Sequence, residues 1–207
     1  NGNPVTQMNT LNKSDVFRQL VDLQQDLFKS WKLYAKIQWD SENVSSTDYD
    51  TDTHVQTHGR ESLQDAERKT RNILSFYAAV DGKIYRDLDL RLTLRNDIVN
   101  DKSMGFFPTA TLVYRMPFVK GLSFNAGYSH NYRNPTLNDL YWNPGGNENL
   151  KGEDGKTVDF DINYLYENVN FNLDFRTGLY YSKVNDWIQW VPTNYRYWMP
   201  RNVSKVL

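Results

Sequence analysis

Hydrophobic and polar residues alternate along much of this chain, with the two-residue period of a β-strand whose two faces meet different surroundings. The clearest alternation covers residues 31–40, 85–98, 122–131 and 158–166, where every second side chain is mostly apolar or aromatic. Residues 169–179 repeat the same pattern. We therefore predict a series of strands, each with one apolar and one polar face.

Other segments have weaker patterns. Residues 14–27 fit both strand and helical spacing, and the neighbouring strands favour a strand, whereas the residues before them are predicted to be irregular. Residues 71–80, whose alternation is blurred, and residues 106–116 are also predicted as strands. Residues 187–195 are predicted as an aromatic loop or strand end, and residues 197–207 as the beginning of one more strand.

The predicted connections alternate in length. Short turns are expected at residues 28–30, 81–83, 117–121 and 167–168, the second of them from its Asp-Gly sequence. The connections between them, at residues 41–67, 133–156 and around 191, are expected to be longer, apart from a short polar connection at residues 100–105. Outer-membrane barrels have short turns at one end and long loops at the other, whereas a Greek-key sandwich needs a long crossover. The alternation therefore favours neighbouring strands paired in sequence order.

Composition is compatible with strands that cross a membrane. No run of about 18 apolar residues is present, which excludes a transmembrane helix, but barrel strands need only alternating hydrophobicity over about 10 residues. The mean hydropathy of −0.72 fits strands that turn half of their side chains to water. We predict an all-β fold, an up-and-down antiparallel transmembrane β-barrel of which this chain holds a partial set of strands. A soluble or surface-attached β-sandwich that binds carbohydrate through aromatic loops is the alternative.

The two faces of the predicted sheet can be assigned from the alternation. The side chains expected to face lipid are Leu88, Leu90, Leu92, Phe124, Phe160, Ile162, Phe171 and Leu173. Those expected on the opposite, wet face are Arg91, Arg95, Asp159, Asp161 and Asp174. Arginine and aspartate on neighbouring strands of the wet face are expected to pair.

The segment between the strands at 122–131 and 158–166 is dense in Asn, Pro, Gly and aromatic residues, which do not continue a sheet. Residues 132–142 read YRNPTLNDLYW, and residues 145–151 read GGNENLK. The sequence of these two stretches resembles a loop of TonB-dependent outer-membrane receptors, whose pattern is roughly Y-R-x-P-T-x-N-D-L-Y and then G-N-x-x-L-x-P-E. The cobalamin receptors resemble it most, and the siderophore receptors come next. Gly152 departs from the family pattern, which usually has proline there.

The resemblance implies that residues 1–207 are part of a receptor β-barrel domain, with about nine of its roughly 22 strands. The plug domain, the early strands and the last strands would be absent from this sequence. By the same resemblance, the intact protein sits among the lipids of the outer membrane of a Gram-negative bacterium. It would import a scarce small molecule, either a corrinoid such as cobalamin or an iron chelate, with energy that the TonB complex delivers through the plug.

Several classes of function lack support in the sequence. The net charge of −1 suggests no nucleic-acid partner. The three histidines are not spaced as metal ligands, and neither a phosphate-binding glycine loop nor a nucleophile elbow is present. We therefore expect no enzymatic activity and no cofactor, apart from the calcium ion considered below.

Four residues of the 132–142 segment are candidates for ligand binding: Tyr132, Arg133, Tyr141 and Trp142. They offer flat apolar area with polar groups at the edge, which is typical of recognition surfaces. The alternative is that the segment encodes the architecture of the loop, which its apolar residues would fold onto the barrel rim without touching a ligand.

Three alternating carboxylates, Asp48, Asp50 and Asp52, could gather around a calcium ion, which prefers oxygen ligands. The glycine and the distal glutamate of a calcium-binding loop are missing at the required offsets. A solvated acidic loop is therefore the favoured interpretation of this stretch.

Overall fold

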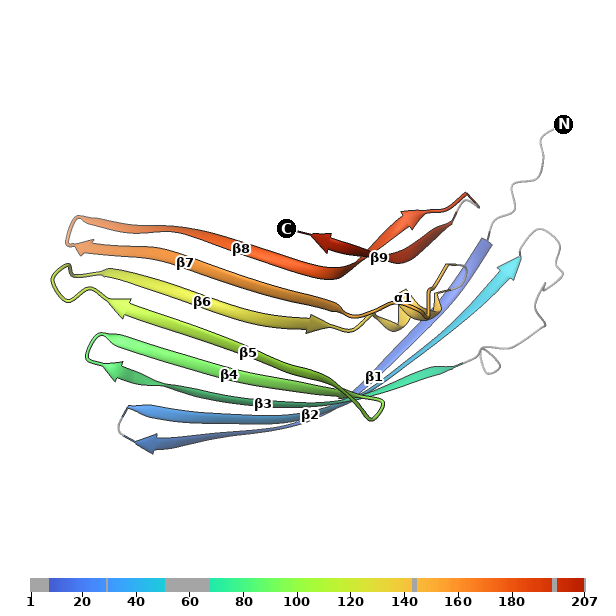
Figure 1. Cartoon of the computed structure of the whole chain (residues 1–207), viewed down its shortest axis with the longest axis horizontal. Coiled ribbons are helices and arrows are strands. Elements are labelled where there is room, and N and C mark those ends of the chain that lie inside the picture. Colours follow the sequence, from blue (N-terminus) through green and yellow to red (C-terminus); the bar gives the residue numbers. More distant parts are fainter. Residues whose placement is uncertain (1–7, 29, 51–67, 143–144, 195–196, 207) are drawn as a thin grey trace.

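The computed structural model describes this chain except residues 1–7, 29, 51–67, 143–144, 195–196 and 207. The described residues form one nine-stranded antiparallel sheet whose strands lie in sequence order (Figure 1). The strands are β1 (Met8–Phe28), β2 (Trp31–Asp50), β3 (Lys69–Tyr85), β4 (Leu88–Val99), β5 (Lys102–Arg115), β6 (Leu122–Arg133), β7 (Glu153–Asn168), β8 (Phe171–Pro192) and β9 (Trp198–Val206). A short helix, α1 (Leu137–Tyr141), lies between β6 and β7.

The predicted up-and-down topology is confirmed. Each strand pairs with the strands next to it in sequence, and no crossover occurs within the described ranges. Strand β6 pairs with β7 as expected, with Leu122 opposite Tyr164 and Asn131 opposite Gly155. No helix among the described residues has the length and apolar character that crossing a membrane requires.

The strand register places the apolar and the charged side chains on opposite faces of the sheet. Residues that lie directly opposite each other share a face, so rows can be followed from strand to strand. One row contains Leu33, Val80, Leu92, Ala110, Tyr128, Val158 and Tyr181. The next row, on the other face, contains Lys32, Asp81, Arg91, Thr111, Gly127, Asp159 and Tyr180. We call these the apolar face and the polar face, and they agree with the two predicted sets.

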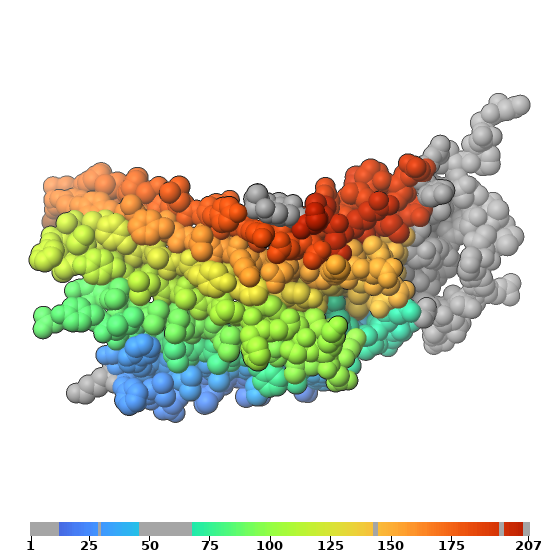
Figure 2. All heavy atoms as spheres, in the orientation of Figure 1, coloured from blue at the N-terminus to red at the C-terminus, as the bar shows by residue number. Residues whose placement is uncertain are grey.

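The apolar face is not covered by a second layer. Leu92 is 43% exposed, Phe160 45% and Leu179 79%, although each belongs to a central part of its strand. Figure 2 shows the strands following one another across the molecule. A β-sandwich would bury such side chains between two sheets about 10 Å apart. The structure therefore does not support the sandwich alternative, and the single sheet matches part of a barrel wall.

The apolar face has the length of a transmembrane strand, which needs about 9–11 residues. On β7 its side chains run from Val158 to Tyr166, a stretch of nine residues that covers about 26 Å along the strand. On β2 the same distance separates Trp31 from Trp39. With the 35–45° strand tilt of outer-membrane barrels this length corresponds to a height of about 20 Å, which fits within their apolar band of about 25 Å with its flanking aromatic residues. We call these rows the apolar band.

The polar face carries ion pairs between neighbouring strands, as expected. Arg91 of β4 pairs with Asp81 of β3, and Arg115 of β5 pairs with Asp89 of β4. Arg18 of β1 contacts Asp40 of β2 with a nitrogen–oxygen distance of 2.7 Å. These pairs leave the guanidinium groups partly exposed, so each stabilises the sheet only modestly.

The predicted turn at Asp81-Gly82-Lys83 is wrong, because β3 continues to Tyr85 and the turn lies at Arg86–Asp87. Gly82 stays in the strand, where it makes room for an aromatic ring. A Cβ atom at Gly82 would lie 2.3 Å from Cδ2 of Trp31 on β2. The glycine is therefore explained by close packing within the sheet rather than by a turn.

Other strands are longer than predicted. Strand β1 begins at Met8, and β2 continues through residues 41–50, which were expected to form a loop. These residues pair along their whole length, from Phe17 opposite Ser41 to Met8 opposite Asp50. Backbone hydrogen bonds between strands do not depend on side-chain polarity, so a polar sequence can extend a sheet beyond the apolar band.

Two further boundaries differ from the predictions, and the last two strands agree with them. The connection after β4 is a two-residue turn at Asn100 and Asp101, whose φ angles of 45° and 66° suit a tight hairpin. The turn after β7 lies at Val169–Asn170, two residues later than expected. Residues 187–192 form the end of β8, as one of the two predicted options had it, and β9 is the predicted last strand. One end of the sheet therefore has only short turns, and the other end carries the longest connections.

Candidate functional site

Residues 134–152 join β6 to β7 at the long-loop end of the sheet, and we call them the 134–152 loop. The sequence starts helix α1 locally. The hydroxyl of Thr136 accepts a hydrogen bond from the backbone N–H of Asp139 at 3.0 Å, and the Asp139 carboxylate accepts one from the N–H of Thr136 at 2.8 Å. This reciprocal arrangement is a capping box, and it satisfies two donors at the start of the helix.

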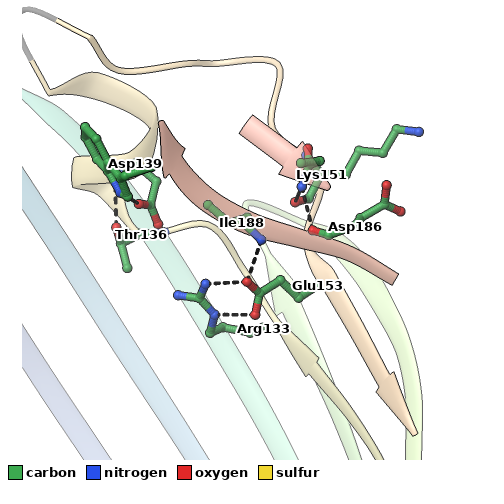
Figure 3. A network of polar contacts seen from close by, with 9 residues as sticks. Arg133, Thr136, Asp139, Lys151, Glu153, Asp186 and Ile188 are labelled. Carbon is green, nitrogen blue, oxygen red and sulfur yellow. Dashed lines mark hydrogen bonds and ion pairs between the residues drawn. The ribbon is translucent and has the colours of Figure 1, made fainter. Parts of the chain in front are cut away.

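An ion pair closes the base of the loop. Arg133 at the end of β6 lies opposite Glu153 at the start of β7, and its guanidinium donates two hydrogen bonds of 2.7 and 2.6 Å to the carboxylate (Figure 3). The same carboxylate accepts a hydrogen bond of 2.8 Å from the backbone N–H of Ile188 on β8. Glu153 is buried. Its three bonds tie together three consecutive strands.

The ion pair also changes the acidity of Glu153, which lies five residues beyond Val158 and so outside the apolar band. Hydrogen bonds from the Arg133 guanidinium lower the pKa of the Glu153 carboxyl below its ordinary range. Burial opposes this shift, and the N–H of Ile188 supports it. The carboxylate is therefore held in its charged form, which is the form that accepts all three hydrogen bonds.

The loop contacts strands on one side of β6. Arg71 of β3, which is buried, donates a hydrogen bond of 2.5 Å to the carbonyl of Pro135. The same guanidinium pairs with Glu42 of β2 at 2.5 Å. Nearby, the ammonium of Lys69 lies 5.3 Å from the ring centroid of Tyr141. The start of the loop is thus fixed to the polar face of β2 and β3.

The loop also contacts β8 and β9 on the other side. The indole N–H of Trp190 on β8 donates a hydrogen bond of 2.9 Å to the carboxylate of Asp139. On β9, Asn202 exchanges two hydrogen bonds with the backbone of Lys151, of 2.9 and 3.0 Å. The side chain of Asn147 reaches the carbonyl of Pro200 at 3.1 Å. Strands that are far apart in the sheet are therefore joined through one loop.

Asp139 is the central residue of this arrangement, and sequence reasoning did not single it out. One carboxylate oxygen caps α1 and the other accepts the Trp190 bond, while the Asp139 carbonyl accepts the N–H of Asn147 at 2.9 Å. The residue is 6% exposed. The T-x-x-D sequence at residues 136–139 is the signal that could have found it. Glu153 is the last residue of the quoted loop pattern, whereas Arg71 and Trp190 lack such a local signal.

The four predicted ligand-binding residues lie around the base and the start of the loop. The ring of Tyr132 stacks on buried Phe107, with 5.3 Å between centroids and 11° between planes. Together Tyr132 and Tyr141 line a hollow of about 450 Å³. Tyr132 and Arg133 line a second hollow of about 510 Å³ on the polar face. Trp142 ends helix α1, where its N–H donates to the carbonyl of Asn138 at 3.0 Å.

Gly152, the departure from the family pattern, lies against Tyr132. A Cβ atom at position 152 would stand 2.0 Å from the hydroxyl oxygen of Tyr132. A proline at this position would therefore need Tyr132 to move. In this chain the glycine lets the tyrosine ring stay stacked on Phe107.

The candidate calcium ligands Asp48, Asp50 and Asp52 have side chains outside the described residues, so the calcium site stays a prediction. Among the side chains that are described, no group of three His, Asp or Glu is arranged to hold a metal ion.

Comparison with known proteins gives the family of this chain. The family model described as "TonB dependent receptor-like, beta-barrel" matches residues 1–206. Among curated proteins, the vitamin B12 transporter BtuB of Photobacterium profundum is 29% identical over 128 residues, which is 59% of this chain and 20% of that protein. The vitamin B12 transporter BtuB of Vibrio vulnificus is 32% identical over 84 residues, or 40% of this chain and 13% of that protein. The chain thus spans a fifth or less of these relatives.

Solved structures agree on the fold. The siderophore receptor PirA of Pseudomonas aeruginosa superposes with a TM-score of 0.67 at 15% identity, covering 94% of this chain and 35% of that chain. The copper transporter OprC superposes with a TM-score of 0.76 at 12% identity, covering 95% and 34%. At these identities the likeness shows a common fold alone. The family match, the single sheet and its uncovered apolar face lead to one conclusion: this chain belongs to the TonB dependent receptor-like β-barrel family and is part of a barrel wall in the outer membrane of a Gram-negative bacterium.

Proposed function

We propose that the intact protein containing this chain takes up a scarce small molecule across the outer membrane, with energy that the TonB complex delivers through a plug domain. The family match over residues 1–206 carries this proposal. The family consists of transporters and receptors rather than enzymes. With the long loops at the outer end, the 134–152 loop lies at the outer mouth, where an arriving ligand first meets the wall.

Between the two candidate ligands, a corrinoid such as cobalamin is favoured over an iron chelate. Both curated relatives are named vitamin B12 transporters, with 29% and 32% identity in the matched regions. The siderophore receptor is similar at 15% identity, which supports the fold and says little about the ligand.

Within the outer mouth, we propose that Tyr132, Tyr141 and Trp142 offer aromatic area to the ligand. A large, partly apolar ligand such as a corrinoid suits aromatic side chains with polar edges. Arg133 is not proposed to contact the ligand, because its guanidinium already donates two short hydrogen bonds to the Glu153 carboxylate. Its role in ligand binding would be to hold Tyr132 and the loop in position.

Calorimetric titration of the full-length receptor with cobalamin, and separately with iron chelates, tests this function. Cobalamin should bind and the chelates should not. Uptake of labelled cobalamin by whole cells should stop when TonB is deleted. Binding of a chelate without cobalamin would move the proposal to iron uptake, and binding of neither would refute the function while leaving the fold unaffected.

The role of Trp142 can be tested in the same assay. Trp142→Ala should weaken binding about tenfold or more if the ring touches the ligand, because burying one such side chain contributes roughly 2–3 kcal/mol. Trp187→Ala, an exposed tryptophan on β8, is the matched control and should leave the affinity unchanged. A normal affinity together with a low yield of folded Trp142→Ala receptor would show that this residue only supports the loop.

A further inference from the structure

Two lysines lie directly opposite each other on the apolar face. Lys156 of β7 is paired in register with Lys183 of β8. The next pair inward, Thr157 and Ser182, joins its hydroxyls in a hydrogen bond of 2.9 Å on the polar face. Because successive side chains on a strand point to opposite faces, Lys156 and Lys183 both leave the sheet on the apolar face.

The strand register gives the position of this lysine pair relative to the apolar band. One row further toward the short turns, Val158 lies opposite Tyr181, and Phe160 then lies opposite Leu179. Val158 ends the apolar band on β7 at the long-loop end. The lysines therefore stand one row outside the band, about 7 Å along the strands from Val158 and Tyr181. In this family the long-loop end is the outer one, so the pair lies where the hydrocarbon of the outer leaflet gives way to headgroups.

The pair is electrostatically unfavourable by itself. Like charges directly opposite each other on neighbouring strands repel and destabilise the sheet. Both lysines are exposed, and within the described part of the chain neither has a hydrogen bond or an ion pair. Asp154, on the same face of β7, is bound instead to His130 at 2.7 Å. On the polar face, by contrast, arginines such as Arg91 and Arg115 have aspartate partners.

We propose that Lys156 and Lys183 together bind a phosphate group of a lipid in the outer leaflet. Two ammonium groups on adjacent strands can share one phosphate, which replaces their mutual repulsion by attraction. The rows below them supply the apolar contact that acyl chains require, and Tyr181, 57% exposed, places an aromatic ring at the boundary. A lipid satisfies both requirements at once, which a free anion does not.

Native mass spectrometry of the full-length receptor in detergent tests this site. The probe is lipid A with both phosphates, and lipid A without phosphates is the reference. Wild-type receptor should retain the phosphorylated probe and not the reference. The double variant Lys156→Gln with Lys183→Gln should bind it about tenfold more weakly or worse, because each lysine near an anionic lipid surface contributes to the attraction. Lys156→Arg with Lys183→Arg keeps both charges and should keep the binding.

The matched control is Lys32→Gln with Lys36→Gln, which removes the same charge from two exposed lysines on the polar face of β2 and should leave binding unchanged. Folding of each variant is checked by its heat-dependent migration in gels, and Lys183→Gln alone replaces the double variant if that one does not fold. Equal binding by the glutamine variant, or equal retention of the dephosphorylated lipid, would overturn the proposal. Loss of the lipid on adding millimolar inorganic phosphate would also overturn it, in favour of a free-anion site.

Discussion

At position 152 the lack of a side chain has a specific packing role, since Tyr132 occupies the space that a Cβ atom would need. Gly152→Ala should therefore displace the ring from Phe107 and lower the free energy of unfolding by about 1–3 kcal/mol, the usual cost of overpacking. Gly155→Ala is the matched control, because its Cβ would meet its nearest neighbour, Cγ2 of Val184, at an ordinary 3.6 Å. Urea unfolding of the full-length receptor in detergent would measure both variants.

The same experiment can be extended to the partner of the clash. In a Gly152→Ala background, a further Tyr132→Ala change should cost less than it costs in the wild-type receptor, because the clash has gone. Such non-additivity is expected for residues in contact. Additive losses, or equal losses at positions 152 and 155, would contradict the packing role of Gly152.

The Arg133–Glu153 pair predicts a dependence of stability on acid. Arg133 lowers the folded-state pKa of Glu153, so the stabilisation is fully present above the pKa of a glutamate in the unfolded chain, about 4.3. It is lost as the pH falls through the lower folded-state value. The Arg133 side chain is 51% exposed, so the effect should be modest, about 1 kcal/mol or less.

Glu153→Gln isolates this contribution. The variant should be less stable than wild type at neutral pH, and the difference should shrink as the pH is lowered below about 4. Urea unfolding midpoints from pH 3 to pH 6 would measure it, with Glu148→Gln, an exposed residue of the same loop, as the control. A difference from wild type that is constant over this range would show that the charge of Glu153 is not what stabilises the site.

At the scale of elements, helix α1 joins strands that do not touch each other. The carbonyl of Pro135, just before α1, is bound by Arg71 of β3, and Asp139 within α1 is bound by Trp190 of β8. The five loop residues 135–139 thus connect strands that are five positions apart in the sheet. We expect that loss of the Trp190–Asp139 hydrogen bond also destabilises the contact between Arg71 and Pro135.

Trp190→Phe tests this coupling, since it keeps the ring and removes the N–H donor. Hydrogen exchange of the full-length receptor should become faster in α1 and also at the outer end of β3, around Arg71. A hydrogen bond to a charged acceptor contributes about 1.5–3 kcal/mol, so exchange should accelerate about tenfold or more. Trp187→Phe is the control on the same strand. Acceleration confined to β8 would show that the two ends are independent.

How well each element could be predicted follows from its surroundings. Between lipid and water the alternation is enforced, and the strands around Leu92, Phe124 and Phe160 are recognised from it. Residues 41–50 lie beyond the apolar band, where polar side chains suit both faces, so nothing in their sequence distinguishes a strand from a loop. The turn at residues 81–83 was wrongly predicted because the sequence does not distinguish a glycine that makes room for Trp31 from a glycine in a turn.

Only those features of the candidate site that consecutive residues encode could be predicted from the sequence. Tyr132 and Arg133 stand out as an aromatic residue and a cation in a distinctive segment, and the capping box of α1 can be read from four consecutive residues. The contacts of Arg71 and Trp190 depend on which strands the loop reaches once the sheet is formed. That information comes from the curvature of the whole sheet rather than from any short stretch of sequence.

For the whole molecule, the two ends of the sheet should lie on opposite sides of the membrane. The chain contains no cysteine, so single cysteines can be introduced at Lys102, at the long-loop end, and at Val169, in a short turn. In a full-length receptor free of other cysteines, a membrane-impermeant maleimide added to intact cells should label Lys102→Cys and leave Val169→Cys unlabelled. Both should react once the outer membrane is permeabilised, and the reverse pattern in intact cells would invert the orientation.

The neighbour-only strand order also has a consequence for the sequence of events in folding. Hairpins closed by two-residue turns, such as those at Arg86–Asp87 and Val169–Asn170, need little chain entropy to form. Closing the 134–152 loop costs roughly 2 kcal/mol more than closing a two-residue turn. Its contacts with β3 and with β8–β9 can form only after those strands are in place. We therefore expect the β-hairpins to form first. The contacts of the 134–152 loop with β3, β8 and β9 should form last.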